Sequence, residues 1–411
     1  MNPWRGLGGM PREVWIVFSV TLINRAGTMV LPFLALYVTR GQSLSETDAG
    51  VILMAYGVGA LITSPLSGAL VDRIGARRLM IFSLLSSAIL LYALSAAQNY
   101  WAIFWGVFVW AVVSEAFRPA SLAIMSELVA PELRKSAFAL SRLAVNVGMS
   151  IGPAVGGFLA AWSFKALFVV DSLTSLAAGI VLLVTPWSYH KLAASKDGTE
   201  GKAVQEAVAH VNGGAGRATG NGYYDRTLLY FLAALIPVVV VFFQIRSTAP
   251  LYIVRYLSMP ESTWGLLVII NTIMVIVLEI PLTGLTAFWS HKRASALGAF
   301  LIGTGFGGLA LARGVWGSAL SVVILTFGEM IFMPASSAYV AHIAPSRSKG
   351  QYLGLYTMAF NVAFLIAAIA GTQTLERFGP TVLWLSAFAC GLLSTVMLLG
   401  LRDDRSAAEA D

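Results

Sequence analysis

Long apolar runs recur along the whole chain, and they constrain its fold more than any other feature of the sequence. Each run is about 20 residues long, which as an α-helix covers the roughly 30 Å of hydrocarbon in a bilayer. Only 11% of the 411 residues are charged, whereas an average soluble domain carries roughly 25%. The roughly 10-residue alternating segments of a membrane β-barrel do not occur. The sequence therefore predicts an all-α membrane protein.

Twelve such runs predict twelve transmembrane helices arranged as two six-helix bundles. They lie approximately at residues 14–37, 49–71, 79–97, 101–129, 137–161, 166–186, 227–250, 263–286, 294–312, 316–343, 352–373 and 381–401. Lys and Arg concentrate in alternate connections and in both terminal segments. Since cytoplasmic connections carry the excess of basic residues, both termini are expected in the cytoplasm.

The longest connection divides the chain into its expected domains. Residues 188–226 are rich in Gly and polar residues, and such a composition cannot bury enough apolar surface to order itself. We therefore expect an N-terminal bundle at 1–187, a cytoplasmic linker at 188–226, a C-terminal bundle at 227–401 and a cytoplasmic tail at 402–411.

An internal repeat supports the division into two halves. Motifs of the first half recur in the second at a separation of about 215 residues, as expected of a duplicated unit. The recurring motifs are Pro65-Leu66-Ser67-Gly68 with Pro281-Leu282-Thr283-Gly284, Glu115 and Pro119 with Glu329 and Pro334, and Asn146-Val147 with Asn361-Val362. Duplicated halves with a substrate site at their interface are a transporter architecture.

Several other functions are disfavoured by what the sequence contains. The net charge of +7 comes from short basic clusters between apolar runs, which fits membrane topology better than nucleic-acid binding. Cys390 is the single cysteine, so no disulfide forms within the chain and no Cys-based metal or redox site is expected. The sequence contains neither a phosphate-binding Gly-Lys-Ser/Thr loop nor a hydrolase or zinc-enzyme motif. We expect neither an enzyme, nor a cofactor, nor a bound metal.

Two longer motifs carry a family resemblance. The connection Gly68-Ala-Leu-Val-Asp72-Arg73-Ile-Gly75-Ala-Arg77-Arg78 resembles the signature loop of the major facilitator superfamily. The segment Asn146-Val-Gly148-Met-Ser-Ile-Gly152-Pro153-Ala-Val-Gly156-Gly157 resembles the Gly-Pro motif of the twelve-helix drug/proton antiporters in that superfamily.

The resemblance implies roles for both motifs. It assigns Gly68, Asp72, Arg73, Gly75, Arg77 and Arg78 to a cytoplasmic gate, to which we add Glu127 as an expected partner. It ties the second motif to antiport. Independently of the resemblance, Gly148, Gly152 and Gly156 share one helix face, and small residues on a helix face let another helix approach closely. Close packing alone is the competing interpretation of this stripe.

The sequence also departs from the drug/proton antiporter pattern. Arg118 is followed by Pro119 where that branch has Gln and Gly, and Phe288 replaces the aspartate in the second copy of the loop. The residues around Glu329 are similar to helix 10 of proton-coupled oligopeptide transporters. Only Arg25 matches their helix 1 motif.

Charged residues near the centre of predicted helices indicate where chemistry occurs. A charge at that depth costs about 2.5–3.5 kcal/mol on insertion scales, so it is rarely without a function. Arg25, Glu115, Arg118 and Glu329 belong to helices 1, 4 and 10, which line the central cavity in the resembled fold. Glu329 is the first candidate for a proton carrier, Glu115 the second and Glu279 the third. A fixed ion pair of Arg25 with Glu115 is the competing interpretation.

The resulting prediction is a secondary active transporter in the bacterial inner membrane. We expect a monomeric, proton-coupled antiporter that exports small amphipathic or drug-like molecules; proton-coupled uptake of peptides or another metabolite is the alternative. A membrane enzyme or a passive channel is the competing class. The expected partners are a small-molecule substrate, protons and lipid, without nucleic acid. Polar residues expected in the substrate cavity are Asn24, Arg25, Tyr37, Arg118, Asn146, Gln244, Asn271 and Asn361.

Overall fold

The computed structural model describes residues 10–129, 133–187, 225–286, 288–345 and 349–401, and none of these residues lies in a β-strand. The all-α expectation is thus confirmed for the described ranges. The predicted linker at 188–226 lies almost entirely outside them, and the tail at 402–411 lies wholly outside.

Helices occupy most of each predicted range. The first half contains α1 (Arg12–Gly27), α2 (Val30–Leu36), the π-helical turn η1 (Tyr37–Gly41), α3 (Glu46–Ile74), α4 (Ala76–Leu94), α5 (Tyr100–Ser114), α6 (Phe117–Glu127), α7 (Arg134–Trp162) and α8 (Phe164–Val184). The second half contains α10 (Arg226–Phe242), η4 (Phe243–Arg246), α11 (Thr248–Leu251), the π-helical turn η5 (Tyr252–Tyr256), α12 (Glu261–Thr286), α13 (His291–Gly308), α14 (Val315–Ile343) and α15 (Lys349–Leu399).

The number of membrane crossings is only partly determined by these helices. In the described part, nine helices are long and apolar enough to span a bilayer. One of them, α15, has 51 residues and bends at Gly379, whose φ of 81° is not helical and precedes Pro380. Glycine adopts positive φ without a steric penalty, so it permits this turn between two helical segments. Twelve crossings remain the prediction.

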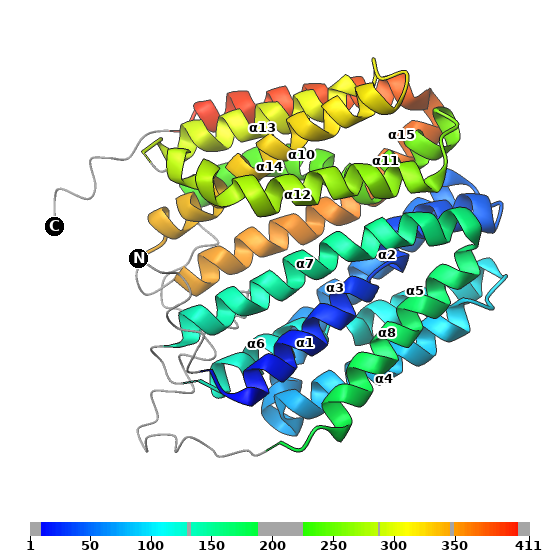
Figure 1. Cartoon of the computed structure of the whole chain (residues 1–411). Helices are drawn as coiled ribbons and strands as arrows, with labels where there is room; N and C mark the ends of the chain where they lie inside the picture. Colours follow the sequence, from blue (N-terminus) through cyan, green and yellow to red (C-terminus); the bar gives the residue numbers. More distant parts are fainter. Residues whose placement is uncertain (1–9, 130–132, 188–224, 287, 346–348, 402–411) are drawn as a thin grey trace.

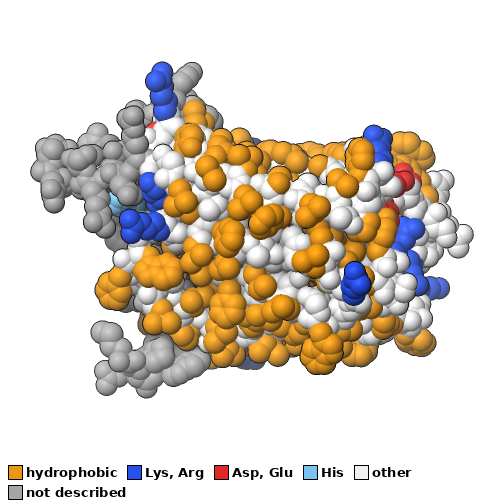
Figure 2. All heavy atoms as spheres, turned by 90° about the horizontal axis from the view of Figure 1, so that it is seen from above, with side chains coloured by type: hydrophobic (Ala, Val, Ile, Leu, Met, Phe, Trp, Pro, Cys, Tyr) orange, Lys and Arg blue, Asp and Glu red, His pale blue; other side chains and the backbone are white. Residues whose placement is uncertain are grey.

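The two halves lie side by side, and the start of α1 and the end of α15 lie at the same end of the molecule (Figure 1). Helix α7 of the first half runs alongside α12 of the second, where a Cβ at Gly157 would lie 2.9 Å from the Cα of Gly265. Charged side chains gather mostly toward the two ends, with a largely apolar region between them (Figure 2). This distribution fits a bilayer around the middle of the molecule.

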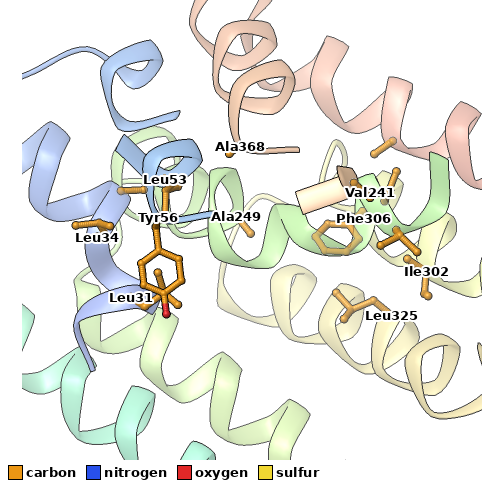
Figure 3. Packing of buried hydrophobic residues seen from close by; sticks show 14 of the residues in the cluster. Leu31, Leu34, Leu53, Tyr56, Val241, Ala249, Ile302, Phe306, Leu325 and Ala368 are labelled. Atoms are coloured by element: carbon orange, nitrogen blue, oxygen red, sulfur yellow. The ribbon is translucent and has the colours of Figure 1, made fainter. Parts of the chain in front are cut away.

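A continuous buried cluster joins both halves (Figure 3). It includes Leu34 and Leu53 from the first half and Val241, Phe306 and Leu325 from the second. Lipid is as apolar as these side chains, so close packing stabilises the contacts more than burial from water does.

Candidate functional site

Two predicted helices are interrupted near their centres, and polar residues lie at the interruptions. The first separates α1 from α2 at Thr28 and Met29, and the second separates α5 from α6 at Glu115 and Ala116. A broken helix leaves backbone groups that need partners inside the membrane. At the first break, Oδ2 of Asp171 accepts hydrogen bonds from the backbone N–H groups of Met29 at 3.0 Å and Val30 at 3.1 Å.

A small polar cavity lies between these breaks in the first half. It leaves about 40 Å³ open to the centres of water molecules, room for a few of them. Its lining includes Asn24, Arg25, Tyr56, Glu115 and Asp171. The Tyr56 hydroxyl donates a 2.6 Å hydrogen bond to Oε1 of Glu115. The predicted residues Asn24, Arg25 and Glu115 therefore meet at one cavity.

A matching polar group lies in the second half. The Asn271 side-chain amide donates to Oε2 of Glu329 and to the Thr326 hydroxyl, both at 2.9 Å. Glu329 also interacts electrostatically with Glu279 and Arg246. Asn271, Glu279 and Glu329 are thus brought together, as α12 and α14 pack side by side.

Arg246 connects the two polar groups. Arg118 interacts electrostatically with Glu115, Arg25 and Arg246. Because Arg246 also acts on Glu329, the charged residues of both halves form one electrostatic cluster. Its members are Arg25, Glu115 and Arg118 from the first half and Arg246 and Glu329 from the second.

The competing interpretation of a fixed Arg25–Glu115 ion pair does not match this geometry. The ion pairs found in the described part of the chain lie elsewhere, between Arg40 and Glu261 and between Arg255 and Glu46. The guanidinium of Arg25 instead lies 5.7 Å from the centre of the Phe117 ring.

Two residues expected in the substrate cavity are used in packing. The Tyr37 hydroxyl donates to the carbonyl of Ala97 at 3.0 Å, and its ring packs on Phe168. The amide of Gln244 donates to the carbonyl of Ala367, and its oxygen accepts a 2.7 Å hydrogen bond from Thr248. The structure therefore does not bring Tyr37 or Gln244 to the charged cluster. Asn146 and Asn361 lie half-buried on α7 and α15.

The glycine stripe of α7 packs against the broken first helix. A Cβ at Gly148 would lie 2.5 Å from Cβ of Arg25, and one at Gly152 would lie 2.8 Å from the carbonyl oxygen of Thr28. A Cβ at Gly156 would lie 3.2 Å from Cβ of Met29. The stripe thus supports the helix that carries Arg25, and Pro153 lies inside the same helix.

The residues of the predicted gate lie around the junction of α3 and α4. Gly75 has a φ of 86° and joins the two helices directly. Arg77 donates to the carbonyl of Leu182 at 2.8 Å and lies 5.0 Å from the Trp187 ring, so it binds the end of α8 in its own half. Gly68 has open space around it, and Arg73, Arg78 and Glu127 are exposed. The side chain of Asp72 lies outside the described part.

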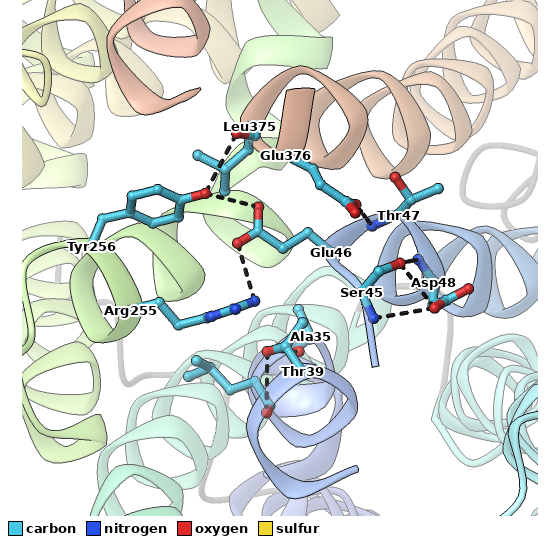
Figure 4. Close-up of polar contacts among 11 residues, drawn as sticks. Ala35, Thr39, Ser45, Glu46, Thr47, Asp48, Arg255, Tyr256, Leu375 and Glu376 are labelled. Atoms are coloured by element: carbon cyan, nitrogen blue, oxygen red, sulfur yellow. Dashed lines mark hydrogen bonds and ion pairs between the residues drawn. The ribbon is translucent and has the colours of Figure 1, made fainter. Parts of the chain in front are cut away.

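Two reciprocal ion pairs join the halves at the end remote from the start of α1 and the end of α15, which we call the far end. Arg40 of η1 pairs with Glu261 of α12 at 2.7 Å, and Arg255 of η5 pairs with Glu46 of α3 at 3.1 Å. Figure 4 shows the Glu46 pair, where the Tyr256 hydroxyl also donates to Glu46 at 3.3 Å. Nearby, Glu376 accepts a 2.6 Å hydrogen bond from the backbone N–H of Thr47.

The far end repeats the internal symmetry at atomic detail. Arg255 follows Arg40 by 215 residues, and Glu261 follows Glu46 by 215. Ser43 and Ser258, with the same separation, have φ values of 56° and 54°. The sequence analysis missed these ion pairs, although the shared separation of Tyr37-Val-Thr-Arg40 and Tyr252-Ile-Val-Arg255 was a signal for them.

Comparison with known proteins identifies the family. The model of the Major Facilitator Superfamily matches residues 16–256 and 227–411. The chain belongs to this superfamily. It is therefore a secondary transporter of the membrane and not an enzyme, and the resemblance predicted from the two motifs is confirmed.

Relatives within the superfamily differ in the functions that their names state. The uncharacterized transporter YqjV of Bacillus subtilis is 25% identical over 98% of this chain and 94% of its own length. A Na⁺, Li⁺, K⁺/H⁺ antiporter of Planococcus maritimus is 23% identical over 89% and 90%. The multidrug resistance protein MdtG of Proteus mirabilis is 31% identical over 38% and 40%.

Solved structures share the fold at low sequence identity. The peptide transporter POT in complex with sulfate superposes with a TM-score of 0.78 at 16% identity, covering 97% of this chain and 98% of the other. The expected major facilitator fold is thereby confirmed, while this likeness carries no information on substrate.

Proposed function

We propose that this transporter is a proton-coupled antiporter that exports small amphipathic or drug-like molecules by alternating access. We place it in the bacterial inner membrane with both termini in the cytoplasm. In this orientation the far end faces outward, and its two ion pairs close the outer side of the substrate path. The halves correspond to residues 1–187 and 227–401.

The charged cluster shared by the two halves is the observation that carries the proposal. Glu115 and Glu329 belong to opposite halves, and Arg246 acts electrostatically on both Arg118 and Glu329. Rocking one half against the other changes the distance between these charges. A carboxylate that loses its cationic neighbour inside a membrane takes up a proton, and it releases the proton when the neighbour returns. This arrangement ties protonation to the conformational cycle.

The driving force is sufficient for useful export. One proton moving inward across 100 mV releases about 2.3 kcal/mol, which sustains a roughly fiftyfold gradient of a neutral substrate. The names of two relatives, a multidrug resistance protein and a cation/proton antiporter, support export and proton exchange respectively.

Transport in proteoliposomes with an interior pH dye tests the proposal. Addition of a transported molecule is expected to evoke proton movement, and Glu329→Gln is expected to abolish it. Glu13→Gln, a substitution at the start of α1, serves as the matched control and should retain coupling. Movement of a substrate without any proton signal would rule out proton coupling. The direction of proton movement relative to substrate separates antiport from the uptake alternative.

Exchange of monovalent cations for protons is the second candidate. The Planococcus maritimus relative spans 89% of this chain, and its name states that activity. Proton efflux evoked by Na⁺, Li⁺ or K⁺ in the same vesicles would favour this candidate over drug export.

A further inference from the structure

Three arginines of the charged cluster lack ionic partners. Arg25 lies on α1, Arg118 on α6 and Arg246 on η4, so both halves contribute. Within the described ranges, no hydrogen bond or ion pair connects any of the three guanidinium groups to another residue. The Nε atom of Arg25 is buried without an acceptor. A buried guanidinium donor without a partner is costly inside a membrane. Arg118 is exposed and Arg246 is half-buried, so their donors are open to a ligand.

The nearby carboxylates are occupied by neutral donors instead. Glu115 accepts its 2.6 Å hydrogen bond from Tyr56, and Glu329 accepts from Asn271. Asp171 is bound to two backbone N–H groups at the helix break. These three acids therefore do not neutralise the arginines through direct contact.

Positive charge dominates at the centre of the cluster. The charged groups that act on Tyr56 are Glu115, Arg25 and Arg246, and the same three act on Arg118. Counting Arg118 itself, three cations face one carboxylate at this point. Asp171 interacts electrostatically with Arg25, and Glu329 interacts with Arg246 and Glu279.

Aromatic rings line the same cavity as Arg25. The ring of Phe117 lies beneath Arg25 at 5.7 Å, and the rings of Tyr56 and Trp110 are 5.3 Å apart. An aromatic surface beside guanidinium groups fits a ligand that has an apolar body and an anionic end. The planar guanidinium matches a carboxylate with two parallel hydrogen bonds.

We propose that Arg25, Arg118 and Arg246 bind the carboxylate of the transported molecule, so that the substrate is an amphipathic organic acid. This inference rests on the proposed function and narrows its substrate class. Because the arginines come from both halves, the bound carboxylate bridges them at the centre of the path.

Matched ligand sets test the charge preference in the purified full-length protein in nanodiscs. Naphthyl, biphenyl and indolyl rings are each presented as the acetate, the acetamide and the ethylamine, and binding is measured by equilibrium dialysis. At least one acetate is expected to bind about tenfold or more tightly than its acetamide, as for a charge-assisted pair. Equal or tighter binding of the amides or amines overturns the inference, and so does a failure of every acetate to bind.

Variants locate the preference in the arginines. Arg118→Gln and, from the other half, Arg246→Gln are each expected to reduce the preference for the acetate by about tenfold while leaving acetamide affinity within about twofold. Arg118→Lys should give an intermediate loss, and Arg313→Gln, in an exposed connection, should change nothing. An unchanged preference in both glutamine variants contradicts the assignment. Proton exchange with amines in the vesicle assay would retain the proposed function while rejecting this substrate class.

Discussion

Asp171 contributes to the site by holding the backbone of a broken helix. Its carboxylate accepts from Met29 and Val30, the residues at the start of α2, and it is only 3% exposed. Removing this buried acceptor leaves two N–H groups unsatisfied, which typically costs about 1–3 kcal/mol for each buried group. We expect Asp171→Ala to lower the thermal unfolding temperature in detergent clearly. Asp171→Asn, which keeps one acceptor oxygen, should lose less; equal stability of Ala, Asn and unmodified protein would disprove the role.

Individual residues were predictable where charge alone identified them. Arg25, Glu115, Arg118 and Glu329 were expected from their central position in apolar runs, and they lie in one electrostatic cluster. Arg246 was missed because it lies near the end of its apolar run. The distance of a residue from the end of a run gives its depth in the membrane only where the helix is unbroken. Tyr37 and Gln244 were misleading, since their partners Ala97 and Ala367 lie more than 50 residues away along the chain.

At the scale of the helices, the glycines of α7 allow close packing to be tested as the reason for their position. A Cβ at Gly152 would meet the backbone oxygen of Thr28 at 2.8 Å, and that oxygen cannot rotate away. Gly152→Ala is therefore expected to destabilise the protein by about 1–3 kcal/mol, as overpacking does. Gly68→Ala in α3 is the matched control, because nothing lies within 4 Å of the added methyl. Similar unfolding temperatures for the two variants would contradict close packing as the reason for Gly152.

Helices could be predicted from sequence, but their interruptions could not. Apolar length specifies a membrane helix regardless of which residue bends it, so most of each expected range is helical. The break at Thr28 depends on a partner from another helix, Asp171, and the break at Glu115 lies at a side chain that Tyr56 of another helix binds. The repeat was visible in short motifs, whereas the ion pairs of the far end required the halves to be placed together.

For the whole molecule, acidity outside the membrane is expected to affect the far end through Glu46, which precedes the predicted span at 49–71. The pKa of Glu46 is raised, mainly by burial and also by Glu376. Arg255 and Tyr256 lower it by less than burial raises it. The pKa of Tyr256 is raised to about 12, so its hydroxyl remains a donor. A group whose pKa is raised by closure binds its proton more tightly in the closed state.

The sign of the pH effect follows from this linkage. Glu46 favours closure fully below the ordinary glutamate pKa of about 4.3, and this contribution is lost as pH rises through the raised value. Lower external pH should therefore increase the closed population, measured as a shorter distance between spin labels on the two halves at the far end. Glu46→Gln should flatten the response. Opening on acidification would contradict the expected sign.

The reciprocal ion pairs allow the closure of the far end to be tested by exchanging charges between the halves. The Arg40 side chain is 48% exposed, and exposed pairs contribute about 0–1 kcal/mol, so neutralising the Arg40–Glu261 pair lowers the closed-to-open ratio by up to about fivefold. Neutralising Glu46 does not have this effect, because burial outweighs Arg255 in setting the pKa of Glu46. Reversing a single charge places like charges together, and Glu261→Arg should open the far end more than Glu261→Gln.

Combining Glu261→Arg with Arg40→Glu restores opposite charges and should restore closure, because the two residues make their ion pair with each other. Distances between spin labels at Trp101→Cys and Trp316→Cys report the state, since both positions are highly exposed and begin helices at this end. The single native cysteine is removed as Cys390→Ala. The combination of Glu46→Arg with Arg255→Glu repeats the same experiment at the second ion pair. Double reversals that remain as open as the single ones would contradict closure by charge. Single reversals that fail to open the far end would instead favour the close Gly157–Gly265 contact as what holds the halves together.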